Sequence, residues 1–311
     1  MLSSSENENH PTTKVVLCVD IHTPRHDIFL AAFNLLLSTF ALLENILILV
    51  ALYKDSSLRL PSKVMFCCLA ITDLCVGLIS QPIFAVELLL QMSKQQHLCY
   101  HLSAFAEIVI LGFSAVSLMT VTAVSVDRLF ALSLGLRYKQ IVNLRRVTKV
   151  LIFILAFCAT GSILKQVWNS KVAFRVLSIG VVVCLITSFY CYVKIFLRLR
   201  HHQAQVQGHN QNDQFIGIPL NIQRYRKTVS AALSVQLALV ACYLPYAFLL
   251  FFPSLIPLSE SAQILGRRYT TSIVFVNSSL NPFLYCWKIR GVRKAVKETL
   301  TQLLDSMTCC Y

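Results

Sequence analysis

The sequence predicts an all-α membrane protein built as a seven-transmembrane helix bundle. Of its 311 residues, 56% are hydrophobic and only 14% are charged, and seven separate stretches are long and apolar enough to cross a bilayer. Soluble domains carry about 25% charged residues, and a transmembrane helix needs about 20 predominantly apolar ones. Because hydrocarbon supplies no water to backbone polar groups, these stretches must be helices.

The predicted spans follow one another through short connections. They cover residues 28–53, 62–90, 98–130, 146–164, 173–199, 224–252 and 265–287. Residues 1–27 form a polar extracellular tail without the apolar core of a signal peptide, so we expect the first span to direct its own insertion. Residues 200–223 include Gly208, Gly217 and Pro219 among polar residues, which predicts a flexible loop.

The chain after the seventh span is basic and amphipathic. Apolar residues recur at helical spacing opposite a basic face, which predicts a short helix on the inner leaflet within the cytoplasmic segment 288–311. Cys309 and Cys310 follow it and are candidates for palmitoylation; two unmodified cytosolic thiols are the alternative. Cys18 and Cys99 are the cysteines expected on the oxidising side, which predicts a disulfide between them.

The distribution of charge indicates membrane topology rather than nucleic-acid binding. The formal net charge is +14, and 20 of the 28 Lys and Arg residues lie on the side of the predicted carboxyl terminus against 8 on the other. Basic residues stay on the cytoplasmic side, so we expect an extracellular amino terminus and a cytoplasmic carboxyl terminus. The expected location is the plasma membrane, with lipids as partners and no role for nucleic acid.

Polar residues inside the spans mark the candidate functional sites. Asp73 lies in the second span, where a charge at mid-bilayer costs about 3 kcal/mol. It therefore needs polar neighbours, which other spans can supply from Asn45, Ser117, Asn277, Ser278 and Asn281. Asp127-Arg128-Leu129 closes the third span, and Pro245 and Pro282 interrupt the sixth and seventh.

These motifs together resemble the rhodopsin-like (class A) G protein-coupled receptors, over residues 28 to 304. The resemblance rests on Asn45, Asp73, Asp127-Arg128-Leu129, Cys242-Tyr243-Leu244-Pro245 and Asn281-Pro282-Phe283-Leu284-Tyr285, each in its expected span. It implies a receptor without catalytic chemistry or cofactor, in which an extracellular ligand promotes nucleotide exchange on a heterotrimeric G protein. Two alternatives stay open. One is a receptor of this fold that captures ligand without coupling, and the other is a pH or zinc sensor using His22, His26, His97 and His101.

The resemblance also implies roles for single residues. The polar cluster would hold a sodium ion with Asp73 and Ser117 among its ligands, although a water-filled polar core is the alternative. The bends at Pro245 and Pro282 would let the inner helix ends move. Arg128 would leave Asp127 on activation and meet the G protein, supported by Tyr192 and Tyr285. Many receptors of the family restrain this arginine with an acid at the inner end of the sixth span, but residues 224–227 contain none. We therefore expect Arg128 to be weakly restrained and the receptor to show basal signalling.

Departures from the family pattern bear on the ligand. Leu129 and Tyr243 replace the usual tyrosine and tryptophan, Cys184 replaces the fifth-span proline, and residues 165–171 contain no cysteine. These features resemble the melanocortin, cannabinoid and lysophospholipid branch. Candidate ligand contacts are Glu87, Glu107, Ile110, Tyr243 and Tyr269. Melanocortin receptors place acids in similar helices to receive a cationic peptide or calcium. Alternatively, the two acids line a wet vestibule or pair with Arg267 or Arg268.

Two ligand classes are disfavoured. Ile110 stands where aminergic receptors place an aspartate, which argues against a monoamine, and Phe275 stands near the position of the retinal-bearing lysine, which argues against an opsin. The remaining expectation is a cationic peptide or a small molecule.

Overall fold

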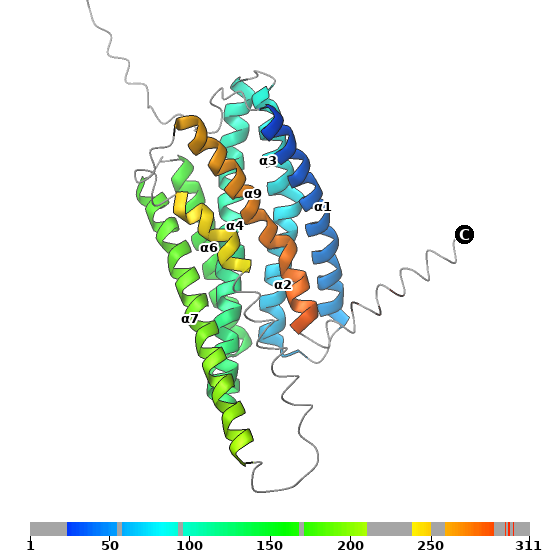
Figure 1. Cartoon of the computed structure of the whole chain (residues 1–311), viewed down its shortest axis with the longest axis vertical. Helices are drawn as coiled ribbons and strands as arrows, with labels where there is room; N and C mark the ends of the chain where they lie inside the picture. The colour runs from blue at the N-terminus through cyan, green and yellow to red at the C-terminus, as the bar shows by residue number, and fades with distance from the viewer. Residues whose placement is uncertain are drawn as a thin grey trace, which may run out of the picture.

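The computed structural model describes residues 24–54, 58–92, 96–167, 171–209, 238–249 and 259–288, together with residues 296, 298 and 301. All secondary structure in these residues is helical, which confirms the predicted all-α class. The long helices run side by side as a bundle (Figure 1).

The helices follow the predicted spans closely. They are α1 (Pro24–Lys54), α2 (Leu60–Cys75), the π-helical turn η1 (Val76–Ser80), α3 (Gln81–Met92), α4 (Gln96–Leu134), the 3₁₀ turn η2 (Gly135–Arg137), α5 (Tyr138–Ile141), α6 (Leu144–Val167), α7 (Lys171–His209), the helix Ala238–Leu249, and α9 (Glu260–Lys288). Five spans in the described part are long and apolar enough to cross a membrane, with α2, η1 and α3 joined in one of them. The helix Ala238–Leu249 and α9 occupy the predicted sixth and seventh spans.

Two boundaries differ from expectation. The helix α7 continues to His209, so the prediction that the loop begins at residue 200 is wrong. Residues 200–207 contain no glycine or proline and include good helix formers such as Gln and Ala, which extend the helix beyond its apolar part. The helix α1 begins at Pro24, four residues before the expected start, and this brings Asp27 into the helix. The predicted amphipathic helix lies outside the described residues, apart from positions 296, 298 and 301.

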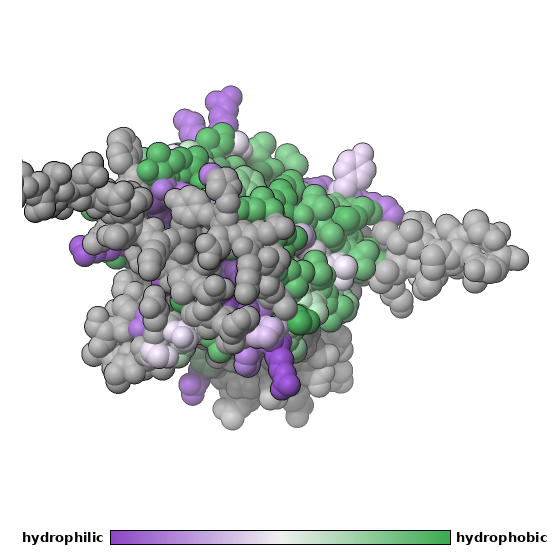
Figure 2. Space-filling model, turned by 90° about the horizontal axis from the view of Figure 1, so that it is seen from above, coloured by the Kyte–Doolittle hydropathy of each residue, from purple (hydrophilic) through white to green (hydrophobic). Residues whose placement is uncertain are grey.

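The surface and the interior have the polarity of a membrane protein. Leu43, Phe153 and Ile186 are each more than 60% exposed, at 68%, 63% and 63%, whereas Asn45 and Asp73 are fully buried. Figure 2, an end-on view, shows hydrophobic residues over much of the coloured flank. Apolar side chains therefore face outward, where lipid takes the place of water, and polar side chains meet inside the bundle.

A glycine permits close approach of the first two spans. A Cβ atom at Gly77 would lie 3.0 Å from the Cβ atom of Ala41 and 3.3 Å from the backbone oxygen of Ser38. The Ser38 hydroxyl donates a hydrogen bond of 2.7 Å to the backbone oxygen of Gly77. A larger residue at position 77 would push α1 away from η1 and break this contact.

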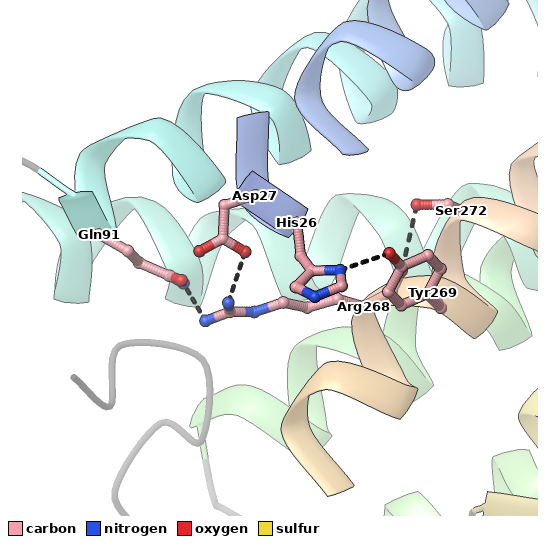
Figure 3. Close-up of polar contacts among 6 residues, drawn as sticks. All are labelled: His26, Asp27, Gln91, Arg268, Tyr269 and Ser272. Atoms are coloured by element: carbon pink, nitrogen blue, oxygen red, sulfur yellow. Dashed lines mark hydrogen bonds and ion pairs between the residues drawn. The ribbon is translucent and has the colours of Figure 1, made fainter. Parts of the chain in front are cut away.

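A polar seam joins α1 to α9 along the bundle (Figure 3). At one end, which we call the Arg268 end, Arg268 forms an ion pair of 2.6 Å with Asp27, and its other terminal nitrogen donates to Gln91 of α3. His26 and Tyr269 form an adjacent hydrogen bond of 2.8 Å. Deeper along the seam, the Asn34 amide donates to the Ser272 hydroxyl at 2.9 Å. The opposite end, which carries Arg128 at the end of α4, is called the Arg128 end.

The ion pair at the Arg268 end is sealed from solvent. The side chains of Arg268 and Asp27 are only 1% and 3% exposed. Removing one member of such a pair leaves an uncompensated charge in a low-dielectric site, which costs about 3–5 kcal/mol. We therefore expect this pair to hold three helices, α1, α3 and α9, in one fixed arrangement.

Asp27→Asn or Arg268→Gln should each lower the unfolding temperature of the purified protein, since each leaves one buried charge unpaired. The double variant Asp27→Asn/Arg268→Gln should lose clearly less stability than the sum of the two single losses, because both charges are then gone. Thermal unfolding of the four proteins measures this coupling. Arg25→Gln, at an exposed position in the same turn of α1, is the control. Simple additivity of the two substitutions would contradict the expectation.

Candidate functional site

The predicted polar cluster around Asp73 forms within the bundle. Asp73 is fully buried, and the Ser117 hydroxyl of α4 donates to its carboxylate at 2.9 Å. Asn45 of α1 donates its amide to the backbone oxygens of Ala41 at 2.8 Å and of Ser278 at 3.1 Å. Asn277 is also buried, at 3% exposure. Four spans therefore contribute to this cluster, while the side chain of Asn281 lies outside the described part.

The atoms of this cluster suit a small hard cation. The carboxylate of Asp73 and the hydroxyl of Ser117 are oxygen ligands of the kind that such ions prefer. The side-chain oxygen of Asn45 is buried and has no hydrogen-bond partner among the described residues. These oxygen atoms therefore suit the sodium ion that the family resemblance implies, and they also suit ordered water.

The Asp127 carboxylate at the Arg128 end is held mainly by residues other than Arg128. The Tyr138 hydroxyl donates to one carboxylate oxygen at 2.6 Å, and the Ser62 hydroxyl donates to the other at 3.2 Å. Burial and the hydrogen bond to Asp127 raise the pKa of Tyr138, so its hydroxyl stays protonated and can donate at neutral pH. The guanidinium of Arg59 covers the Tyr138 ring, 4.6 Å from its centre.

Arg128 is only loosely restrained. Its nearest contact with the Asp127 carboxylate is 3.7 Å, longer than a hydrogen bond, and its side chain is 28% exposed. The guanidinium lies 5.2 Å from the centre of the Phe66 ring. Tyr192 of α7 is buried within electrostatic range of Arg128. The side chains of Pro282 and Tyr285 and the whole segment 224–227 lie outside the described residues.

A small cavity lies between α4, α7, the helix Ala238–Leu249 and α9. Its volume is about 40 Å³, and its walls are mainly apolar, with Ile110, Val181, Tyr243, Tyr246 and Val274 among the lining residues. Tyr243 donates to the backbone oxygen of Ser114 at 3.2 Å, which fixes its ring in the wall. Two of the five candidate ligand residues, Ile110 and Tyr243, therefore meet at this cavity.

The other three candidate ligand residues lie elsewhere. Glu107 forms an ion pair of 2.7 Å with Lys165 of α6. Glu87 is fully buried, and neither of its carboxylate oxygens has a hydrogen-bond partner in the described part of the chain. Tyr269 belongs to the seam with α1, where it contacts His26. None of the three is among the residues lining this cavity.

Three residues that matter here were not predicted from the sequence. Asp27 and Lys165 are the ion-pair partners of Arg268 and Glu107. A pairing of Glu107 with Arg267 or Arg268 was one of the alternatives, and the structure shows Lys165 instead. Tyr138 binds Asp127 from the short helix after α4. The position of Lys165 in the last turn of α6, where its side chain can reach the neighbouring helix, could have indicated this ion pair. For Tyr138, an aromatic residue among basic ones offered only a weak signal.

The predicted disulfide and histidine site involve residues outside the described part. Cys99 is disulfide-bonded, whereas the seven other cysteines whose side chains the structure describes, which include Cys158 and Cys184, are free. Its partner therefore lies outside those residues, and Cys18 stays the predicted one. Among the described residues, no group of three or more His, Cys, Asp or Glu side chains could hold a metal ion. The described residues do not include His22, the side chain of His97, or the palmitoylation candidates Cys309 and Cys310.

Comparison with known proteins agrees with this arrangement of spans and polar residues. A family model described as "7 transmembrane receptor (rhodopsin family)" matches residues 44–174 and 160–285. The chain is also similar to melanocortin receptor 4 of Danio rerio, with 23% identity over 294 residues that cover 89% of this chain and 83% of that receptor. The family match confirms the predicted seven-transmembrane fold and the rhodopsin-like receptor class. The chain belongs to the rhodopsin-like (class A) family of G protein-coupled receptors.

Proposed function

We propose that this receptor binds a ligand in the cavity between α4, α7, the helix Ala238–Leu249 and α9, and that binding promotes nucleotide exchange on a heterotrimeric G protein. In this proposal the protein resides in the plasma membrane with the Arg268 end outside. The excess of Lys and Arg on the Arg128 side supports that orientation.

The observation that carries the proposal is the weak restraint on Arg128. Tyr138 and Ser62 occupy the Asp127 carboxylate, and Arg128 keeps only a 3.7 Å contact with it. A partly exposed pair of this length is worth about 0–1 kcal/mol. A small shift in the inner helix ends is therefore enough to release a guanidinium that a G protein could bind. This arrangement favours coupling over ligand capture alone.

Arg128→Gln should reduce nucleotide exchange on purified heterotrimeric G protein by about 10-fold or more, because charge-assisted hydrogen bonds contribute about 1.5–3 kcal/mol each. The assay uses the full chain in lipid nanodiscs without added ligand and then with candidate ligands. Lys149→Gln removes an exposed basic residue of α6 on the same side and is the control. Exchange that is absent in every G protein class for the unmodified chain would support the non-coupling receptor instead.

Asp127→Asn should raise basal exchange only about 2-fold to 5-fold. The wild-type pair is weak, so removing it shifts the inactive–active equilibrium by less than about 1 kcal/mol. Asp127→Glu keeps the charge and should stay near the wild-type rate. A rise of more than about 100-fold in Asp127→Asn would show that Arg128 is strongly locked and that this part of the proposal is wrong.

We also propose that sodium binds at Asp73 and Ser117, with Asn45, Asn277, Ser278 and Asn281 around it. At a sodium concentration about five times the dissociation constant, a bound ion stabilises the inactive receptor by about 1 kcal/mol. Replacing sodium chloride by choline chloride at equal ionic strength should therefore lower the unfolding temperature of the ligand-free protein.

Asp73→Asn should abolish this sodium dependence, whereas Glu44→Gln, which neutralises a half-buried acid of α1, should retain it. An equal sodium effect in the wild type and in Asp73→Asn would exclude the site. The polar cluster would then be a core of side chains and water alone.

A further inference from the structure

A positively charged side chain, that of Arg267, lies near one end of the cavity. Arg267 lies one turn from Thr271 and two turns from Val274 on the same face of α9, and both of those residues line the cavity. Residue 266 lies close to the helix Ala238–Leu249, because a Cβ atom there would be 3.3 Å from the Leu249 side chain. Arg267 therefore stands above the lining residues, toward the Arg268 end.

Electrostatics place Arg267 at the same cavity. Arg267 and Glu107 both lie within electrostatic range of the hydroxyl of Tyr246, which is itself a lining residue. Arg267 is half-buried, and its guanidinium makes no hydrogen bond or ion pair with any other residue in the part of the chain that the structure describes. A guanidinium remains charged at all physiological pH values, so an unmatched one at an apolar cavity favours an anion.

Three acids whose side chains the structure describes, Glu107, Asp27 and Glu87, lie at this end of the bundle. Glu107 lies one turn above Ile110 on α4 and is engaged by Lys165 at 2.7 Å. Asp27 is engaged by Arg268 at 2.6 Å, and Glu87 is fully buried away from solvent. Among the side chains that the structure describes, Glu107 and Asp27 are therefore each paired with another base, and neither forms an ion pair with Arg267.

We propose that the ligand is an amphipathic monoanion: a compact apolar body in the cavity and one carboxylate bound by Arg267. The apolar walls would bury the body, and Tyr246 would offer its hydroxyl group near the carboxylate. The planar fork of an arginine binds a carboxylate with two parallel hydrogen bonds, which also orients the ligand. This inference rests on the proposed function, because it names the ligand class of the same cavity.

The test uses unbranched monocarboxylates of four to ten carbons and 3-phenylpropanoate, each compared with the alcohol and the amine of the same skeleton. Thermal unfolding of the purified full chain in nanodiscs reports binding without a G protein. We expect at least one carboxylate to stabilise the protein at concentrations where its alcohol and amine do not. Arg267→Gln should weaken the apparent affinity about 10-fold or more, whereas Arg267→Lys should keep the preference for the anion.

Matched variants separate the charge at the cavity from the overall charge of this surface. Arg25→Gln removes an exposed arginine of α1, which does not line the cavity, and should leave carboxylate binding unchanged. A preference for the amines, abolished by Glu107→Gln, would overturn the proposal in favour of a cationic ligand that takes the place of Lys165. Failure of every carboxylate to stabilise the protein, or equal stabilisation of the wild type and Arg267→Gln, would also overturn it.

Nucleotide exchange measured on the same preparations distinguishes this inference from the proposed function. Exchange that depends on Arg128 without any carboxylate binding would leave coupling intact and reject the anion. Carboxylate binding that depends on Arg267 without exchange on any G protein would support the anion and reject coupling.

Discussion

A hydrocarbon environment supplies no water to buried polar groups, and this constraint explains most of the contacts between the helices. Each carboxylate or amide inside the bundle must find its partner on another helix or remain costly. Asp73 receives the Ser117 hydroxyl, Asn34 binds Ser272, and Asp27 binds Arg268. The helices are thus joined by a few polar contacts, spaced along a surface that is otherwise apolar.

The two ends of the bundle differ in how strongly they are held. At the Arg268 end, a sealed ion pair and the amide of Gln91 connect three helices. At the Arg128 end, the guanidinium keeps a contact of 3.7 Å and is partly exposed. Breaking the first costs about 3–5 kcal/mol, whereas breaking the second costs at most about 1 kcal/mol. Of these two described contacts, the one at the Arg128 end is therefore the easier to break.

The cavity and the Arg128 end are connected through the same helices. Helix α4 carries Ile110 at the cavity, Ser117 at the polar cluster and Arg128 at its end. The Ser117–Asp73 contact lies between the other two, so a shift of α4 at the cavity would alter the polar cluster before it reached Arg128. A cation bound at Asp73 would resist that shift, because it prefers the arrangement in which its oxygen ligands are close together. A ligand and sodium would then oppose each other through one helix.

The sequence alone was enough to predict the seven-transmembrane fold and the receptor family, and it identified Asp73 and Ser117, which form a hydrogen bond in the structure. Those features depend on apolar length and on polar residues whose burial demands partners, and both can be recognised along the chain. The sequence did not reveal which charged residues form ion pairs with each other. Pairing of Glu107 with Arg267 or Arg268 was only one alternative, and the structure shows that Glu107 binds Lys165 and that Arg268 binds Asp27.

Only the tertiary structure decided these pairings, because residues as distant in sequence as Asp27 and Arg268 meet only once the helices are packed and rotated against one another. The same packing decided which candidate ligand residues share a cavity. Ile110 and Tyr243 do, whereas Tyr269 turns toward α1. It also left Arg267 without a counter-ion among the described residues, a property that depends on where every neighbouring acid points and not on the identity of any one residue.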